Sequence, residues 1–523
     1  MRQSNLLILN TLITYVRMAL TVGLGLLATR LLLRALGFVD FGIVAALGAT
    51  GALLAIVSDS LTSSAQRNMA FEIGRRDNER LGIVFNTSLA VFCMAGILIA
   101  LLGVALANVV LSTLQIPESR ADAAWWAYHL TLANLAVTML AVPFSAIIDA
   151  HQAMVVSASR DFLLSLFQLA AVAALLWAPG DRLINYAMLL LVSRLLIYLL
   201  FVAVAIRLFP ASRPRIGLIR RGEVRGIMSF AGWASLGSLG WQLRMQGSVV
   251  LLNVCFGPVV NAAYAIATQV GGYQGSLGGA VSVAARSATV VVHASGAGEA
   301  LKSLVLATGK YTCLSMLFLL IPVQIEVAAL LKAWLGNYPE MTETFVRLAM
   351  VWVALLALGA GYHLAALALG KLARYTLMMS SFDMAVLLLG AVGFFLLDWP
   401  PVSLLVGAVV LTAVQVTMQA RFVGSQIGLS LGAWFSRLVR PVALVLAAGL
   451  APALLIHWLL PAGLIRVALV FMAAAISLTP AIWLVALERP EYERLGGILS
   501  DVVRRVKRLV SAGTGTDRSE ATP

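Results

Sequence analysis

Charge and cysteine are both scarce in this sequence. Only 11% of its 523 residues are charged and 3 are cysteines, whereas 61% are hydrophobic. Cys93, Cys255 and Cys313 all lie in apolar stretches, so they indicate neither a disulfide framework nor a metal cluster. This composition excludes a soluble globular protein and is typical of a chain that crosses a membrane many times.

Motifs for enzymatic chemistry are missing as well. The sequence has no Walker loop for a nucleotide and no H-E-x-x-H metal motif. The stretches between its apolar runs are too short to build the acidic site of a glycosyltransferase or polymerase. We therefore predict a protein that is not an enzyme and has no cofactor. Without a nucleotide site, active transport would use a Na⁺ or H⁺ gradient, the membrane potential or the supply of substrate.

Long apolar runs fill most of the chain instead. A helix needs roughly 20 apolar residues to cross a bilayer, and the first run is too long for a cleavable signal peptide. The expected spans are residues 6–33, 41–64, 83–112, 124–148, 162–178, 184–207, 229–255, 259–285, 303–325, 345–369, 376–397, 402–421, 441–460 and 464–487. The sequence therefore predicts an all-α polytopic membrane protein with about 14 transmembrane helices.

The basic residues gather in short stretches between the apolar runs. Six arginines lie between residues 207 and 225, and others lie between the second and third runs. Because basic loops stay on the cytoplasmic side, we expect the N- and C-termini to be cytoplasmic. This topology accounts for the net charge of +14 without nucleic acid as a partner. Residues 488–523 are predicted to form a cytoplasmic tail whose basic amphipathic helix lies on membrane lipids.

The chain contains an internal repeat. A shift of 220 residues aligns Leu36–Val39 with Phe256–Val259, and Glu79–Leu81 with Glu299–Leu301. Six spans repeated in the same orientation predict two lobes, related by an axis along the membrane normal, with a cavity between them. The expected units are an N-lobe (1–220), a C-lobe (221–440), two extra spans (441–487) and the tail (488–523).

Polar residues form a stripe along the first span. Asn10, Thr14, Arg17 and Thr21 recur at helical spacing and share one face. A guanidinium facing lipid at that depth costs about 3 kcal/mol or more, so it should face the cavity or a partner. We therefore predict that this face lines the cavity, with a purely structural arginine as the alternative.

The seventh and eighth spans supply further candidates for substrate binding. Gln246 and Asn253 lie on one face of the seventh span and Arg244 on another, and the sequence does not decide which face lines the cavity. Asn261 lies on a polar face of the eighth span. The predicted substrate contacts are Arg17, Asn10, Thr14, Arg244, Gln246, Asn253 and Asn261.

Two acidic residues are candidates for ion coupling. Asp383 lies in the eleventh span beside Ser380 and Ser381, and a carboxylate next to hydroxyl oxygens suits Na⁺ or H⁺. Asp59, toward the cytoplasmic end of the second span, is the other candidate. A structural hydrogen-bond acceptor is an equally good interpretation of Asp383. The other informative ionisable residues within spans are Arg194 and Lys310.

Motifs in a fixed order carry a family resemblance. They are RALGFVDFG at 34–42, SAQR at 64–67, DNERL at 77–81, FGPVVNAA at 256–263 and WLG at 334–336. Over residues 5–440 the chain resembles bacterial polysaccharide flippases, O-antigen flippases among them, of the multidrug/oligosaccharidyl-lipid/polysaccharide exporter superfamily. The cationic cavity residues of that family correspond here to Arg17 and Arg244.

The resemblance implies two six-helix lobes and transport by alternating access. The substrate would be a polyprenyl-diphosphate-linked oligosaccharide, moved from the cytoplasmic to the outer leaflet for surface polysaccharide biosynthesis. The sequence departs from the lipid II branch, whose first span usually offers more than one inward arginine. It also departs from the drug/cation antiporter branch, because Arg17 stands where an acidic cation site is expected. Polysaccharide polymerase and export machinery are the expected protein partners.

Two other functions remain open from the sequence. A cation-coupled small-molecule antiporter would use Asp59, Asp383 and Glu326 as its carriers. A non-transporting scaffold of a polysaccharide assembly complex would need none of these residues. Charge-assisted hydrogen bonds from arginine to a diphosphate are strong, which favours the flippase.

Overall fold

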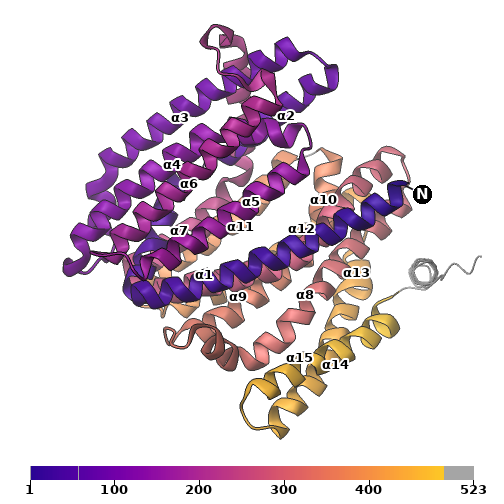
Figure 1. Cartoon of the computed structure of the whole chain (residues 1–523). Helices are drawn as coiled ribbons and strands as arrows, with labels where there is room; N and C mark the ends of the chain where they lie inside the picture. Colours follow the sequence, from indigo (N-terminus) through magenta and orange to yellow (C-terminus); the bar gives the residue numbers. More distant parts are fainter. Residues whose placement is uncertain (1, 57, 371, 488–523) are drawn as a thin grey trace, which may run out of the picture.

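The computed structural model describes the backbone of residues 2–56, 58–370 and 372–487. Within these ranges it describes all side chains except those of 2–18, 154, 230, 231, 233–238 and 372. The described part is helical and contains no β-strand (Figure 1), which confirms the predicted all-α fold. The expected tail helix in 488–523 lies outside the described residues, as do the side chains of Asn10, Thr14 and Arg17.

The main elements are α-helices joined by short turns. In chain order they are α1 (Arg2–Leu54), α2 (Ser58–Arg75), α3 (Asn78–Thr113), α4 (Ala121–Ala150), α5 (Met154–Leu175), α6 (Arg182–Leu208), α7 (Arg221–Ala294), α8 (Gly298–Leu335), α9 (Thr342–Ala357), α10 (Ala360–Leu369), α11 (Leu372–Leu396), α12 (Val402–Ile427), α13 (Leu431–Trp434), α14 (Arg440–Leu459) and α15 (Leu464–Ala481). Short helical turns lie at Glu118–Arg120, Pro210–Ser212, Ile216–Leu218, Phe435–Val439 and Ile482–Ala486.

The number of membrane spans follows from the long helices. In the described part, 11 helices are long and apolar enough to cross a membrane, and α9 with α10 adds a span bent by 43°. Two of the long helices, α1 and α7, pass through a glycine at which the backbone leaves helical geometry. The parts of α7 before and after Gly257 correspond to the expected spans 229–255 and 259–285. In α1 the part beyond Gly37 begins the expected span 41–64, which continues into α2. With that division the helices agree with the predicted number of about 14.

The sequence repeat corresponds to a repeat of backbone conformation. Gly37 (φ 75°, ψ 179°) and Gly257 (φ 79°, ψ −176°) adopt the same conformation 220 residues apart. Residues with a Cβ rarely adopt such angles, so glycine is suited to both turns. The next turn repeats at the same distance, with positive φ at Arg76 and at Gly296.

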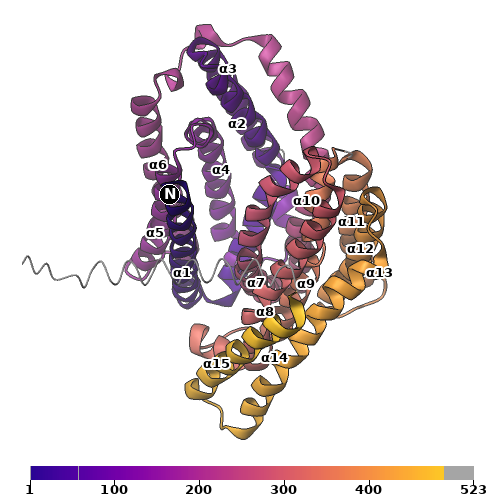
Figure 2. The same cartoon turned by 90° about the vertical axis from the view of Figure 1, so that its right-hand side faces the viewer.

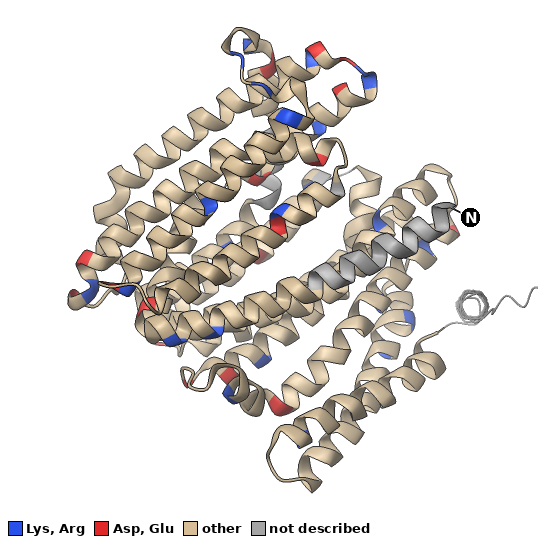
Figure 3. Cartoon of the chain, in the orientation of Figure 1, with Lys and Arg blue, Asp and Glu red and all other residues tan. Residues whose placement is uncertain are grey.

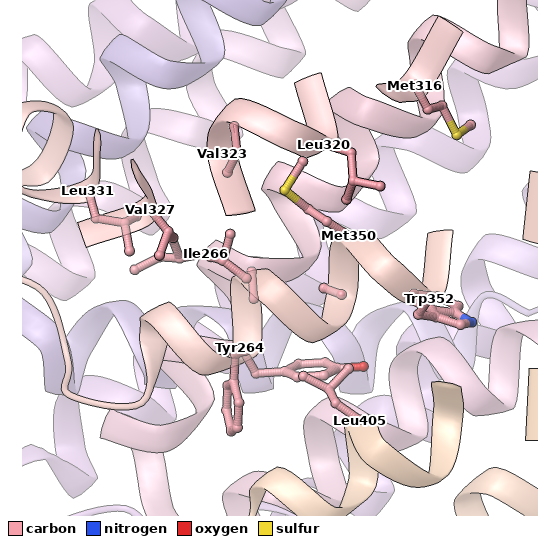
Figure 4. Packing of buried hydrophobic residues seen from close by; sticks show 14 of the residues in the cluster. Tyr264, Ile266, Met316, Leu320, Val323, Val327, Leu331, Met350, Trp352 and Leu405 are labelled. Carbon is pink, nitrogen blue, oxygen red and sulfur yellow. The ribbon is translucent and has the colours of Figure 1, made fainter. Parts of the chain in front are cut away.

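The helices form two lobes, seen side by side in Figure 2. Helices α1 to α6 build the N-lobe, whose apolar core joins α2, α3, α4 and α6. A larger core is centred on the C-lobe of α7 to α12 and extends to residues of α1, α5, α6, α14 and α15; part of it is drawn in Figure 4. Helices α14 and α15 pack on α8, where Gly449 lies close to Ile321 and Leu478.

Two ends of the molecule are distinguished by their loops. We call "basic end" the end that holds the turn between α2 and α3 and the arginine-rich segment 207–225 (Figure 3). The "opposite end" holds Gly37, Gly257 and the turns before α4 and α6. The first turns of α7 pack on the N-lobe at the basic end, because Ile227 belongs to the N-lobe core. Its later part belongs to the C-lobe.

Candidate functional site

The two lobes touch tightly at the opposite end. Gly42 of α1 lies against the backbone of Pro258 in α7, and a Cβ on Gly42 would come within 1.8 Å of the Pro258 carbonyl oxygen. Asn261 Nδ2 donates to the Gly42 carbonyl oxygen at 3.1 Å. The Gln115 backbone N–H donates to Asn253 Oδ1, also at 3.1 Å. Asn253 and Asn261, both predicted as substrate contacts, are thus fully buried between the lobes.

A second set of contacts joins the first span to the C-lobe. Thr29 Oγ1 and Gln269 are hydrogen-bonded at 2.8 to 3.0 Å, and Gln269 Nε2 also donates to Tyr273 Oη. Trp334 of α8 donates its indole N–H to the Leu26 carbonyl oxygen at 2.8 Å. These bonds hold α1 against α7 and α8 on the side nearer the opposite end.

Toward the basic end, α7 presents its glutamine face to the N-lobe. Gln242 Nε2 donates to Asp59 Oδ2 on α2 at 3.0 Å, and Gln246 lies one turn further along the same face. Asp59 is exposed, as are Ser63 and Arg67 on its helix. The face of the seventh span that meets the other lobe is therefore the one with Gln246 and Asn253, a choice that the sequence left open.

Arg244 points the other way, into the C-lobe. Its Nη1 lies 3.0 Å from Asp383 Oδ1, and the side chains of both residues are almost fully buried. The guanidinium lies over the Trp352 ring, 4.4 Å from its centroid. Asp383 therefore has an arginine as its partner, while Ser381 donates to the Met378 carbonyl oxygen. The predicted substrate role of Arg244 and ion role of Asp383 stay predictions, and both would require this pair to open.

Glu326, the third candidate carrier, is also neutralised. It lies in α8 where the helix is irregular, four residues after Pro322. Its carboxylate accepts from Arg466 Nη2 of α15 at 2.8 Å and lies 2.7 Å from His457 Nδ1 of α14. This cluster fastens the two extra C-terminal helices to the C-lobe. Lys310, in the same helix, is buried, and Arg194 in α6 is half-buried.

Sequence reasoning missed an ion-pair cluster of Arg120, Asp40 and Asp181 at the opposite end of the N-lobe, which we call the clasp. Arg120 Nη2 lies 2.7 Å from Asp40, and its Nη1 lies 2.6 Å from Asp181. Burial alone would raise the pKa of Asp181, but hydrogen bonds from Arg120 and from the first backbone N–H groups of α6 hold it below its ordinary value. The three residues are far apart in the sequence, so no local pattern could have indicated the clasp.

A groove at the basic end lies away from the lobe interface. It has a volume of about 800 Å³ and is lined at the basic end of the N-lobe by residues that include Asn78, Arg213 and Arg215. The His151 ring stacks on Phe209 within it. Because one lobe supplies all of its walls, it is not the path between the lobes. Among the described side chains, no three His, Cys, Asp or Glu residues lie together as a metal site.

A match to a known family covers more than half of the sequence. Residues 7–284 match the family described as polysaccharide biosynthesis protein. The chain belongs to this family. That membership confirms the resemblance carried by the motifs between residues 34 and 263. No curated protein was found to match the chain.

Solved structures with the same fold are membrane transporters. An inward-facing multidrug resistance MATE family transporter of the MOP superfamily has a TM-score of 0.64 at 16% identity, over 79% of this chain and 98% of that one. An outward-facing conformation of such a transporter gives 0.56 at 16% identity, over 79% and 95%. A MOP superfamily transporter from Pyrococcus furiosus gives 0.56 at 15% identity, over 80% and 95%. Family, fold and apolar helices together make this chain a multi-pass membrane protein of the polysaccharide biosynthesis family, with the fold of these transporters.

Proposed function

We propose that the protein is a flippase that moves a polyprenyl-diphosphate-linked oligosaccharide across the bacterial inner membrane for surface polysaccharide biosynthesis. The observation that carries the proposal is the match to the polysaccharide biosynthesis family on a chain with a transporter fold. With the basic end in the cytoplasm, the contacts of Gly42 and Asn261 close the path on the outer side. The lobes would then receive the lipid-linked glycan from the cytoplasmic leaflet.

Electrostatics supports an anionic substrate over a cationic one. An antiporter needs a carboxylate that is available to a cation, but Asp383 and Glu326 are both paired with arginines. Arg17 adds a positive charge to the first span, and its guanidinium is suited to bind a diphosphate with two parallel hydrogen bonds. Substrate binding by Arg17, Asn10, Thr14 and Gln246 is part of this proposal.

A cation-coupled antiporter is the second candidate, and Asp59 is the observation in its favour. Within the described side chains, Asp59 is exposed and accepts a hydrogen bond from the uncharged Gln242. Its carboxylate is therefore available to a coupling ion. Asp59→Asn would abolish transport in this case, whereas transport by a flippase driven by substrate supply would persist in the same variant.

The decisive experiment follows the lipid-linked glycan in each leaflet. In cells that lack the protein, labelled glycan should stay in the cytoplasmic leaflet, and the wild-type gene should restore outward transfer. Arg17→Ala should reduce the rate by about 30- to 1000-fold, the effect of losing one buried charge-assisted pair of about 2 to 4 kcal/mol. Arg17→Lys should keep a reduced rate, because lysine retains the charge but not the planar fork.

Both variants should reach the membrane at wild-type abundance, which separates a substrate role from a packing role. Normal outward transfer by Arg17→Ala at normal abundance would contradict the proposed role of Arg17. Unchanged glycan distribution in cells without the protein, together with loss of drug resistance, would favour the antiporter.

A further inference from the structure

A closed ring of hydrogen bonds holds the second half of the broken span. Helix α9 ends at Ala357, and α10 resumes at Ala360 after a 43° bend. Gln419 Nε2 donates to the carbonyl oxygen of Gly359 at 3.2 Å and to Tyr375 Oη at 2.8 Å. Tyr375 Oη lies 2.9 Å from His363 Nδ1. The His363 backbone N–H closes the ring on the Gly359 carbonyl at 2.9 Å, so α10 is tied to α11 and α12.

The chemistry of the partners fixes the direction of the two Gln419 bonds. A carbonyl oxygen only accepts, so the Gln419 group that faces Gly359 is the amide NH₂, which only donates. The same NH₂ faces Tyr375, whose oxygen therefore accepts. The direction of the bond between Tyr375 and His363 depends on the tautomer of the imidazole. When His363 is neutral and carries its proton on Nε2, Nδ1 accepts the single hydrogen of Tyr375 and the ring is closed.

We propose that His363 is a proton-binding site and that proton uptake releases α10 from α11. The His363 residue is exposed, whereas Tyr375 and Gln419 are buried, so the imidazole is the most accessible member of the ring. A proton from water adds to the lone pair of Nδ1, and no other bond of the imidazole changes. Tyr375 Oη then faces two donors, Nδ1–H and the Gln419 NH₂, its own O–H loses its acceptor within the ring, and the ring opens. Histidine ordinarily titrates between about pH 5 and 8, which sets the pH range over which the switch is tested.

The charged surroundings of His363 oppose its protonation. From α7, the guanidinium of Arg286 interacts electrostatically with His363, and it would repel an imidazolium. From α12, the neighbour is the uncharged Gln419. On α11, Tyr375 is followed two turns later by Asp383, whose charge is matched by Arg244. Helix α8 packs on α10 through the Val305 backbone, which is also uncharged.

The N-lobe has no equivalent of this site in the described part. Helix α4 occupies the same place in the repeat, and it runs unbroken from Ala121 to Ala150. A proton switch in α10 would therefore act on the C-lobe alone. Its role in transport, namely coupling C-lobe movement to proton binding, rests on the proposed function, whereas the site itself does not.

Spin-label distances between α10 and α12 test the switch on the full-length protein in lipid vesicles. Labels at the exposed positions Leu367 and Met418 should report one distance population at pH 8 and a second at pH 5.5. The ratio of the two populations should shift by about tenfold, the effect of one lost hydrogen bond. In His363→Gln the pH 8 population should persist at both pH values, because glutamine can accept from Tyr375 and does not titrate.

Two further variants complete the test. Tyr375→Phe breaks the ring at every pH and should show the pH 5.5 population throughout. His129→Gln is the matched control, because His129 is half-buried on α4 and its Nδ1 bonds within its own helix to the Trp125 carbonyl oxygen. It should respond to pH as the wild type does. An unchanged distance in the wild type, or an equal pH response in His363→Gln, would overturn the proposal.

Glycan transfer measured on the same variants separates the two proposals. A pH-dependent distance in a protein that transfers no lipid-linked glycan would refute the proposed function and leave the proton site standing. Glycan transfer that depends on pH equally in wild type and His363→Gln would refute the coupling role and leave the flippase standing.

Discussion

The two lobes share their backbone turns but differ in their interiors. In the N-lobe, α4 is continuous and packs into an apolar core with Phe85, Phe92 and Phe201. In the C-lobe, the corresponding span breaks at Gly359, and polar side chains fill the space beside the break. The N-lobe clasp of Arg120 lies at one end of the lobe, whereas the C-lobe pair of Arg244 and Asp383 lies inside it.

The two copies of the repeat therefore share backbone turns but differ in the side chains that fill their interiors. Arg244 is aligned by the 220-residue shift with Leu24, an apolar residue in the first span. An ion pair buried inside a lobe costs desolvation that a partly exposed pair avoids, so the Arg244–Asp383 pair calls for a functional reason where the aligned N-lobe position holds an apolar residue. We infer that the C-lobe is the half that changes between two conformations and that the N-lobe is the more rigid half.

The largest effect is expected from the buried pair. Arg244→Ala leaves the Asp383 carboxylate without a partner and should destabilise the protein by about 3 to 5 kcal/mol. Thermal unfolding in mild detergent and membrane abundance would measure this loss. Replacing both residues, Arg244→Met with Asp383→Leu, should restore most of the stability. The aligned change in the N-lobe, Leu24→Ala, should cost only about 1 to 2 kcal/mol because Leu24 is partly buried. Equal losses of stability in Arg244→Ala and Leu24→Ala would show that the two aligned positions do not differ in their contribution to the fold.

A smaller effect is expected where the two lobes meet. The added methyl group of Gly42→Ala would clash with the Pro258 carbonyl and should weaken the closed opposite end by about 1 to 3 kcal/mol. Spin labels at Glu118 and Asn337 would detect an increased population of separated lobes. Gly48→Ala is the control in the same helix, since its Cβ would meet nothing within 4 Å. An unaltered distance in Gly42→Ala would show that this contact does not hold the lobes together.

The smallest effect is expected at the N-lobe clasp. Arg120 is partly exposed, so Arg120→Ala should lower the free energy of unfolding by only about 1 to 2 kcal/mol near neutral pH. Because the folded pKa of Asp181 is depressed, its contribution is present above the ordinary carboxyl pKa and is lost as pH falls. The difference between wild type and Arg120→Ala should therefore shrink below about pH 4. A difference that grows on acidification would contradict this assignment.

Much of the fold could be predicted from local sequence properties. The membrane spans follow from hydropathy over roughly 20 residues at a time, and the all-α fold follows from the spans. The repeat was visible in the aligned pairs around Gly37 and Gly257, because a turn with positive φ favours glycine in both copies. The family resemblance depended on short motifs, and their order and spacing can be recognised in the sequence without a structure.

The candidate site was predictable only as a set of residue types. Arg244, Asp383 and Glu326 were recognised as costly residues to keep in a membrane, but their partners were not. Asn253 and Asn261 were expected to meet the substrate, and in this conformation they join the two lobes instead. The sequence shows that each of these residues is polar. Which residues it contacts is known only from the packing of the helices.

The sequence by itself thus determined the helices, their number, their repeat and the family. Each of these depends on hydrophobicity, backbone preference or order along a short stretch of chain. The tertiary structure alone decided that Arg244 pairs with Asp383 at a separation of 139 residues, that Gln242 faces the other lobe, and that His363 closes a ring with Tyr375. Such pairings depend on the rotation of each helix about its axis and on which helices become neighbours, and both are set by the packing of the whole bundle.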